Sequence, residues 1–285
     1  MERQERWITL DGQRMRYVRA GSGPPLLLLH GLLGYSFSWR LNEESLARNA
    51  TLYEVDLLGV GASDRPRGLD YGLRAQARRM LWVMDELGLA SAEVLGTSHG
   101  GALALTMAAL AAEEGRPRIP RLILAAPANP WSKHGRLFSG VLGSAPLRWL
   151  LPAPMRWLAP LCGGLFHARQ YGDRKRIPPG TAEGYIRPML ISGSFEYALD
   201  ILRTLRRDLD EMAGLLPRIA HLPTLFLWGT RDPIVLPDSI APLRACFHRS
   251  ELVMIEGAGH LPYEESPEEF NRAVNGFLAG NSRIA

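Results

Sequence analysis

The chain has 285 residues, of which 46% are hydrophobic and 22% are charged. This composition is that of an ordinary folded enzyme, and the length suits one large domain or a domain that carries an insertion. The formal net charge is +4 at pH 7 and the sequence pI is about 9.3, but the arginines are scattered along the chain. Because no stripe of basic and aromatic residues is present, nucleic acid is not expected as a partner.

The N-terminal residues and the hydropathy of the chain indicate a cytoplasmic protein. Residues 1–6 are charged and lead into no apolar segment of the secretory type. No stretch is long and apolar enough to span a bilayer, so stable membrane insertion is not expected. The two cysteines, Cys162 and Cys246, are far apart in sequence and are expected to be buried free thiols in a reducing compartment.

The first half of the chain alternates predicted strands with predicted helices. Two β-rich runs flank Asp11 and Gly12, a pair of residues that favours a hairpin turn. Further strands are expected at 26–29, 51–56, 92–95 and 122–126, and helices near 38, at 73–87 and at 101–112. This alternation predicts a mostly parallel sheet of about eight strands with helices on both faces, and an antiparallel hairpin at one edge.

From residue 129 to about 216 the alternation stops, and aromatic residues and prolines become frequent. A helix is expected at 195–212, and no strand. We interpret 129–216 as a helical lid inserted into an α/β core formed by 1–128 and 217–285. The aromatic side chains of the lid either line an apolar pocket or pack only within the lid. Its apolar surface either covers the site or forms a homodimer contact.

The alternation resumes with strands at 223–229 and 251–255. A final helix is expected at 267–278, with Ser266 as its N-cap and a proline at its first position.

The strand, turn and helix around Ser98 have the order of a nucleophile elbow. The segment 96–100 has the sequence Gly-Thr-Ser-His-Gly. Gly96 and Gly100 let the strand and the helix approach, while the turn strains the backbone of Ser98 near the positive end of the helix dipole. The pattern predicts that Ser98 is a nucleophile rather than only a helix cap.

Three polar residues follow the carboxyl ends of predicted strands, where sites of open α/β sheets gather. They are Ser98, Asp232 and His260, in that chain order. A serine hydroxyl needs a base to take its proton; His260 is expected to be that base, and Asp232 to orient the imidazole.

Other acidic or amide side chains compete with Asp232 for the orienting role. Asn129 also follows a strand but carries no charge, and Glu256 is expected to point into a turn. Asp208 and Asp210 are expected on the solvated face of a lid helix.

An oxyanion formed during acyl transfer needs two N–H donors. The backbone N–H groups of Leu32 and His99 are expected to supply them, and the side chain of His30 is expected to bond its own turn. The remaining histidines have no metal-ligand spacing, so no metal is expected.

These motifs together resemble the α/β-hydrolase superfamily, in the branch with a helical cap after the sixth strand. The resemblance covers about 5–128 and 217–280 and rests on segments 30–34, 56–66, 96–100, 228–232 and 257–260. It implies a triad of Ser98, Asp232 and His260, an oxyanion hole at Leu32 and His99, and no cofactor. Haloalkane dehalogenases and epoxide hydrolases of this branch use an aspartate where this chain has Ser98.

The expected function is that of a serine hydrolase, a carboxylesterase that cleaves small to medium acyl esters through an acyl-enzyme on Ser98. A C–C bond hydrolase of the same fold is the alternative among enzymes. A hydrolase-fold binding protein or receptor with little turnover is the alternative among non-enzymes.

Overall fold

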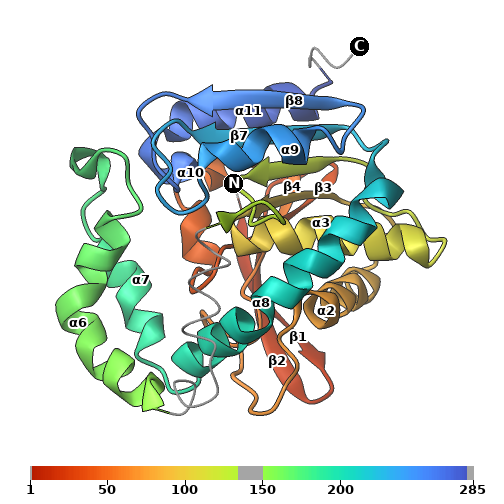
Figure 1. Cartoon of the computed structure of the whole chain (residues 1–285). Helices are drawn as coiled ribbons and strands as arrows, with labels where there is room; N and C mark the ends of the chain where they lie inside the picture. The colour runs from red at the N-terminus through yellow and green to blue at the C-terminus, as the bar shows by residue number, and fades with distance from the viewer. Residues whose placement is uncertain (1, 134–149, 281–285) are drawn as a thin grey trace.

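A twisted eight-stranded sheet forms the centre of the molecule (Figure 1). The computed structural model describes residues 2–133 and 150–280. The strands are β1 (Arg3–Leu10), β2 (Gln13–Ala20), β3 (Pro25–Leu29), β4 (Thr51–Val55), β5 (Glu93–Thr97), β6 (Leu122–Ala125), β7 (Thr224–Gly229) and β8 (Ser250–Ile255). Their order in the sheet is β1-β2-β4-β3-β5-β6-β7-β8. β2 pairs antiparallel with both β1 and β4, and all other pairs are parallel.

The α-helices of the described residues are α1 (Glu43–Leu46), α2 (Leu73–Glu86), α3 (His99–Glu113), α6 (Pro152–Ala168), α7 (Thr181–Met189), α8 (Ser194–Leu215), α9 (Ile240–Arg244), α10 (Pro262–Glu265) and α11 (Pro267–Leu278). Short 3-10 helices are η1 (Ser36–Trp39), η2 (Arg174–Arg176), η3 (Leu216–Ile219) and η4 (Pro237–Ser239). None of the helices in 2–133 and 150–280 has both the length and the apolar composition needed to cross a bilayer.

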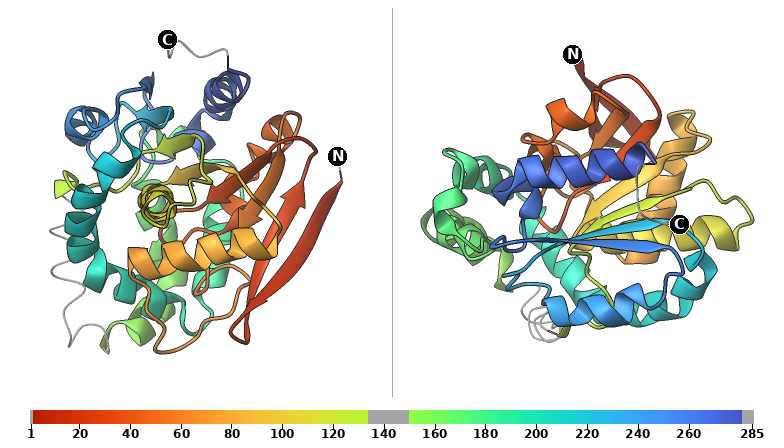
Figure 2. Two further views of the ribbon diagram at one scale, coloured as in Figure 1. Left: turned by 90° about the vertical axis from the view of Figure 1, so that its right-hand side faces the viewer. Right: turned by 90° about the horizontal axis from the view of Figure 1, so that it is seen from above.

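Two hydrophobic layers cover the two faces of the sheet. Leu27 and Leu29 of β3 point to one face with α2, α3, α8 and α9, whereas Leu26 and Leu28 point to the other with α1 and α11. The alternation follows from the two-residue period of a strand, and it makes β3 apolar throughout because both faces are covered. In the right-hand view of Figure 2, α9 and α11 lie on opposite sides of β7 and β8.

The sequence predicted the hairpin and the positions of the strands correctly. Asp11 and Gly12 have φ values of 47° and 78°, as a tight turn between antiparallel strands requires. The mostly parallel sheet with an antiparallel edge is likewise confirmed.

The helices α6, α7 and α8 are inserted between β6 and β7. In Figure 1, α6 and α7 stand beside the sheet, while α8 runs back along α3 and α2. The backbone N–H of Leu73, at the start of α2, donates to Asp208 of α8 over 3.0 Å. Asp208 is therefore buried as a cap of α2, and its expected place on a solvated face was wrong.

Ser266 occupies the N-cap position of α11, as expected, but its side chain makes no capping hydrogen bond; its Oγ accepts a hydrogen bond from Arg176 over 3.0 Å. The expectation for the cysteines was wrong in part. Cys162 is exposed on α6 rather than buried, and Cys246 is partly buried.

Candidate active site

Ser98 lies at the sharp turn between β5 and α3. Its φ of 52° and ψ of −120° are outside the usual regions for a residue with a side chain, a conformation that costs about 1–3 kcal/mol. Hydrogen bonds to both sides hold it: Ser98 donates its N–H to Ala125 over 3.0 Å, and its carbonyl accepts from Ala128 over 2.9 Å. The strain is stored at one residue whose side chain is only partly buried.

Glycines on either side of Ser98 allow the turn to form. A Cβ atom on Gly96 would lie 2.4 Å from the carbonyl oxygen of Gly100. A Cβ atom on Gly100 would lie 2.2 Å from the carbonyl oxygen of Leu29. Both distances are shorter than any contact a methyl group tolerates, so the elbow requires glycine at both positions.

Asp232 and His260 form a buried pair at the ends of β7 and β8. The Nδ1 atom of His260 lies 2.8 Å from Oδ2 of Asp232. The other carboxylate oxygen, Oδ1, accepts the N–H groups of Ile234 and Val235 over 2.8 and 3.0 Å. With Nδ1 turned to the carboxylate, Nε2 of His260 hydrogen-bonds to no described residue and is left to act on a third group.

The two loops that carry this pair are held together by close backbone contacts. A Cβ on Gly229, at the end of β7, would lie 2.1 Å from the carbonyl oxygen of Gly259. The Trp228 indole donates from Nε1 to the carbonyl of Val235 over 2.8 Å, which closes the turn that presents Asp232. The separation of acid and histidine is thus set by packed backbone rather than by flexible side chains.

The loop after β3 lies directly against Ser98. A Cβ on Gly31 would lie 3.2 Å from Cβ and 3.8 Å from Oγ of Ser98. The N–H of Leu32, the next residue, donates no hydrogen bond to any described residue, and the same holds for the N–H of His99 at the start of α3. Two unused N–H groups next to a hydroxyl are what an oxyanion requires.

His30 has a structural role. Its ring makes a hydrogen bond of 2.8 Å between Nδ1 and the carbonyl of Gly31, and its Nε2 accepts from Leu57 over 3.1 Å. Burial lowers the pKa of His30, so the ring stays neutral and keeps both bonds. The ring thereby joins the loop after β3 to the end of β4.

The side chain of His99 is buried beneath the elbow. Its Nε2 lies 3.4 Å from Nε2 of Gln76, and its Nδ1 has no partner. Burial, and secondarily the nearby ring of His30, lower the pKa of His99 to about 3. The side chain of His99 is therefore neutral near pH 7.

A family model described as "Alpha/beta hydrolase family" matches residues 26–273 of the chain. The chain belongs to the alpha/beta hydrolase family. The expected fold is thereby confirmed, and the chain is a member of a family of hydrolytic enzymes.

Relatives of this hydrolase have different named activities. Haloalkane dehalogenase 2 of Mycobacterium tuberculosis is 28% identical, over 95% of this chain and 93% of that protein. Lipase 1 of Psychrobacter immobilis is 26% identical, over 91% of this chain and 78% of that protein. The solved structure of a meta-cleavage product hydrolase from Pseudomonas fluorescens IP01 is 25% identical, with a TM-score of 0.77 over 97% of this chain and 98% of that one.

The acids and amides that compete with Asp232 lie elsewhere in this hydrolase. Asn129 is fully buried and bonds Pro127, Trp131 and Ser239. Glu256 is exposed, and Asp208 caps α2. Among the described carboxylates, Asp232 alone hydrogen-bonds to His260.

One contact with the histidine loop could not be found from the sequence. The N–H of His260 donates to the carbonyl of Gln170, at the end of α6, over 2.7 Å. The buried Glu265 accepts the N–H of Gly259 over 2.6 Å and those of Gly172 and Asp173 over 3.0 and 3.2 Å. Glu265 thus ties the residue before His260 to the inserted helices. In sequence, an acid in the first turn of a helix is indistinguishable from an ordinary solvated one.

A second buried carboxylate joins the insertion to the core. Arg40 makes two hydrogen bonds of 3.0 and 2.9 Å to Glu264, and Tyr171 donates to the same carboxylate over 2.5 Å. Tyr185 of α7 donates to its other oxygen. The Glu264 carboxylate is thus paired with Arg40 and hydrogen-bonded by two tyrosines, and these contacts hold α7, α10 and η1 together.

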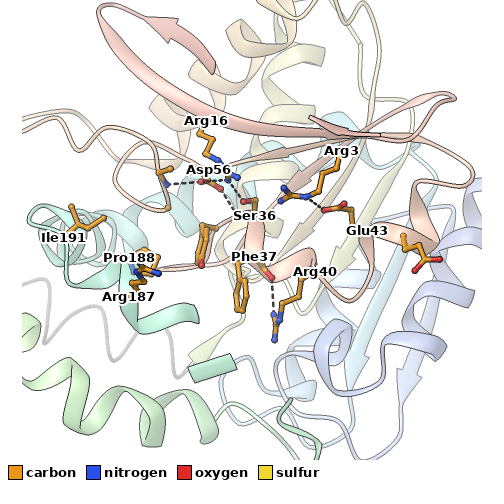
Figure 3. A pocket seen from close by; sticks show the side chains of 14 residues that line it. Arg3, Arg16, Ser36, Phe37, Arg40, Glu43, Asp56, Arg187, Pro188 and Ile191 are labelled. Atoms are coloured by element: carbon orange, nitrogen blue, oxygen red, sulfur yellow. Dashed lines mark hydrogen bonds and ion pairs between the residues drawn. The ribbon is translucent and has the colours of Figure 1, made fainter. Parts of the chain in front are cut away.

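A cavity of about 580 Å³ lies beside these elements, between the core and α7 (Figure 3). Asp56 sits in its wall, where it accepts from Arg16 and from the N–H of Ser36. Arg187 of α7 faces the same space. None of Ser98, Asp232, His260, Leu32 and His99 lines this cavity.

Proposed function

We propose that this protein is a serine hydrolase, a carboxylesterase acting on small to medium acyl esters. The observation that carries the proposal is the buried Asp232–His260 pair, which leaves Nε2 free, together with the strained elbow that holds Ser98. Ser98 is the nucleophile, His260 the general base and Asp232 the orienting acid.

The reaction runs in two halves. The Oγ of Ser98 attacks the ester carbonyl carbon, and its proton passes to Nε2 of His260. The N–H groups of Leu32 and His99 donate to the oxyanion. The oxyanion then collapses, and the alcohol leaves as its oxygen takes the proton from His260. A water molecule then attacks the acyl carbon while His260 takes its proton. The second oxyanion collapses, the bond from the acyl carbon to Oγ of Ser98 breaks, and His260 returns the proton to Oγ, which releases the acid.

The identity of the nucleophile argues against dehalogenation. Displacement of a halide by Ser98 would leave an alkyl ether on the serine, with no carbonyl carbon for water to attack, so the enzyme would stop after one turnover. An acyl ester on Ser98 has that carbonyl and is hydrolysed. The match to a dehalogenase therefore supports a shared fold and site position rather than a shared reaction.

We further propose that 129–216 acts as the cap over a core of 1–128 and 217–285. The hydrogen bonds of Glu265 and Gln170 support this, because they fasten the end of α6 to the loop of His260. A cap joined there would limit the size of the acyl group.

A C–C bond hydrolase is the second candidate. It is favoured by the likeness to the meta-cleavage product hydrolase, which covers nearly all of both chains. A binding protein with little turnover is the third.

The test is hydrolysis of p-nitrophenyl esters, from acetate to long acyl chains, by wild type and by Ser98→Ala. We expect turnover by wild type alone, with a preferred chain length, and no halide release from 1-bromobutane. Labelling of Ser98 by a fluorophosphonate without ester turnover would favour the second candidate, to be assayed with a dienoate substrate. Full ester hydrolysis by Ser98→Ala would rule the mechanism out.

A further inference from the structure

Exposed apolar side chains of the described residues gather on the insertion. Among the described residues of the whole protein, eleven large hydrophobic residues are at least one-third exposed, and eight of them lie between β6 and β7. Six of the eight belong to α6 or precede it by two residues: Leu150, Trp157, Leu158, Leu161, Leu165 and Phe166. We call these six the α6 face. Monomeric soluble proteins rarely expose a contiguous group of this kind without a use for it.

Helical spacing places most of these side chains on one side of α6, with Phe166 at the edge of that side. Residues 157, 158, 161 and 165 recur at intervals that bring them above one another, while Ala159 and His167 on the opposite side are buried. Trp157 and Leu161 are 78% and 74% exposed. In Figure 1, α6 is the outermost helix, with its far side turned away from the sheet. More than half of the surface of Trp157 and of Phe166 is thus exposed to solvent.

The charges around the α6 face are mostly positive, with Asp173 before Arg174 and Glu183 on α7 as the acids nearby in the chain. The segment 129–172 contains no aspartate or glutamate, although it contains five lysines and arginines. Arg169 ends α6, and Arg174 and Lys175 follow in η2; all three are exposed and have no carboxylate partner among the described residues. An apolar face whose flanks are predominantly basic matches an anionic lipid surface.

We propose that the α6 face docks on the surface of an anionic lipid bilayer. α6 lies in the plane of the interface, with Trp157 and Phe166 among the headgroups and the leucines against the acyl chains. Arg169, Arg174 and Lys175 then face the lipid phosphates. A second copy of this chain fits less well, because a two-fold contact would bring the predominantly basic flanks of both copies together.

The test compares wild type with the triple change Trp157→Ser, Leu161→Ser and Leu165→Ser. Trp7→Ser is the matched control, because Trp7 is 41% exposed but lies on β1. Sedimentation with vesicles of phosphatidylcholine and phosphatidylglycerol in equal parts is expected to fall about tenfold or more in the triple variant and to stay unchanged in Trp7→Ser. Binding of wild type should weaken in high salt and with phosphatidylcholine alone.

A second readout needs no change to the apolar residues. Cys162 is exposed on α6, so an environment-sensitive dye can be attached there in a Cys246→Ser background. Its emission should rise and shift to the blue when anionic vesicles are added. The proposal would be overturned if wild type did not sediment with vesicles, or if the triple variant sedimented as well as wild type. A dye response that follows protein concentration without vesicles would also overturn it and would indicate a dimer. Ser98→Ala should bind vesicles like wild type, which separates docking from catalysis.

Discussion

The Nδ1 atom of His260 and the Oδ2 atom of Asp232 are 2.8 Å apart, and both side chains are almost completely buried. The two residues are 28 positions apart in the chain and meet because β7 and β8 are parallel neighbours. Two backbone N–H groups occupy the other oxygen of Asp232, so its carboxylate cannot rotate away. The ring of His260 is therefore held with Nδ1 bonded to Asp232 and with Nε2 free of any hydrogen bond to the described residues.

Asp232→Asn should remove the preference for the useful ring tautomer while keeping the loop. We expect kcat for ester hydrolysis to fall by about 10³–10⁴-fold with little change in stability. Steady-state kinetics beside thermal unfolding would measure both. Glu256→Gln is the control, because Glu256 is an exposed acid four residues before His260; an equal loss in that variant would contradict the assignment.

Glu265 is expected to act as a positioning residue. Glu265→Ala leaves one buried and two partly buried N–H groups without an acceptor, which should cost about 3 kcal/mol of stability. Because Gly259 precedes His260, kcat should fall more than KM rises. Glu265→Gln keeps one acceptor and should restore part of kcat. The exposed Glu269→Ala is the control. A parallel loss of kcat and folded protein, with no rescue by glutamine, would indicate a structural role alone.

The glycines of the elbow can be tested against another helical glycine. Gly100→Ala places a methyl group 2.2 Å from a backbone oxygen and should lower the free energy of unfolding by about 3 kcal/mol. Gly276→Ala in α11 meets no atom within 4 Å and should raise it by about 0.5–1 kcal/mol. Urea denaturation measures both, and similar effects in the two variants would refute the close approach.

Glu54 should make stability depend on pH. Burial raises the pKa of Glu54 well above its ordinary value of 4.5, with the neighbouring carboxylate of Glu43 adding to the effect. The folded protein therefore holds this proton where the unfolded chain has released it, so stability falls as pH rises above about 4.5. Glu54→Gln removes that dependence.

The measurement is urea denaturation of wild type and Glu54→Gln at several pH values from 5 to about 8. The free energy of unfolding of Glu54→Gln should increase steadily relative to that of wild type as pH rises. Glu114→Gln, at an exposed position, controls for the loss of one charge. A constant difference between wild type and Glu54→Gln across the range would show that Glu54 is not titrating.

Local sequence patterns determined the architecture of this hydrolase and the candidate triad. The period of apolar residues, the hairpin turn at Asp11 and Gly12, and the glycines around Ser98 are properties of short segments, and each appears in the structure where it was predicted. The order of Ser98, Asp232 and His260 at strand ends follows from the same segments, because parallel strands bring their carboxyl ends to one edge.

Only the tertiary structure decided which distant segments meet. Asp208 caps α2, Glu265 holds the loop of His260, and the apolar side of α6 faces outward, yet in sequence these are an acid in a helix, an acid before a helix and an ordinary amphipathic pattern. A helix presents the same apolar spacing whether it faces a core or solvent, and a carboxylate looks the same whether or not backbone N–H groups surround it. The physical reason is that burial and hydrogen bonding depend on the approach of residues far apart in the chain, which local periodicity does not encode.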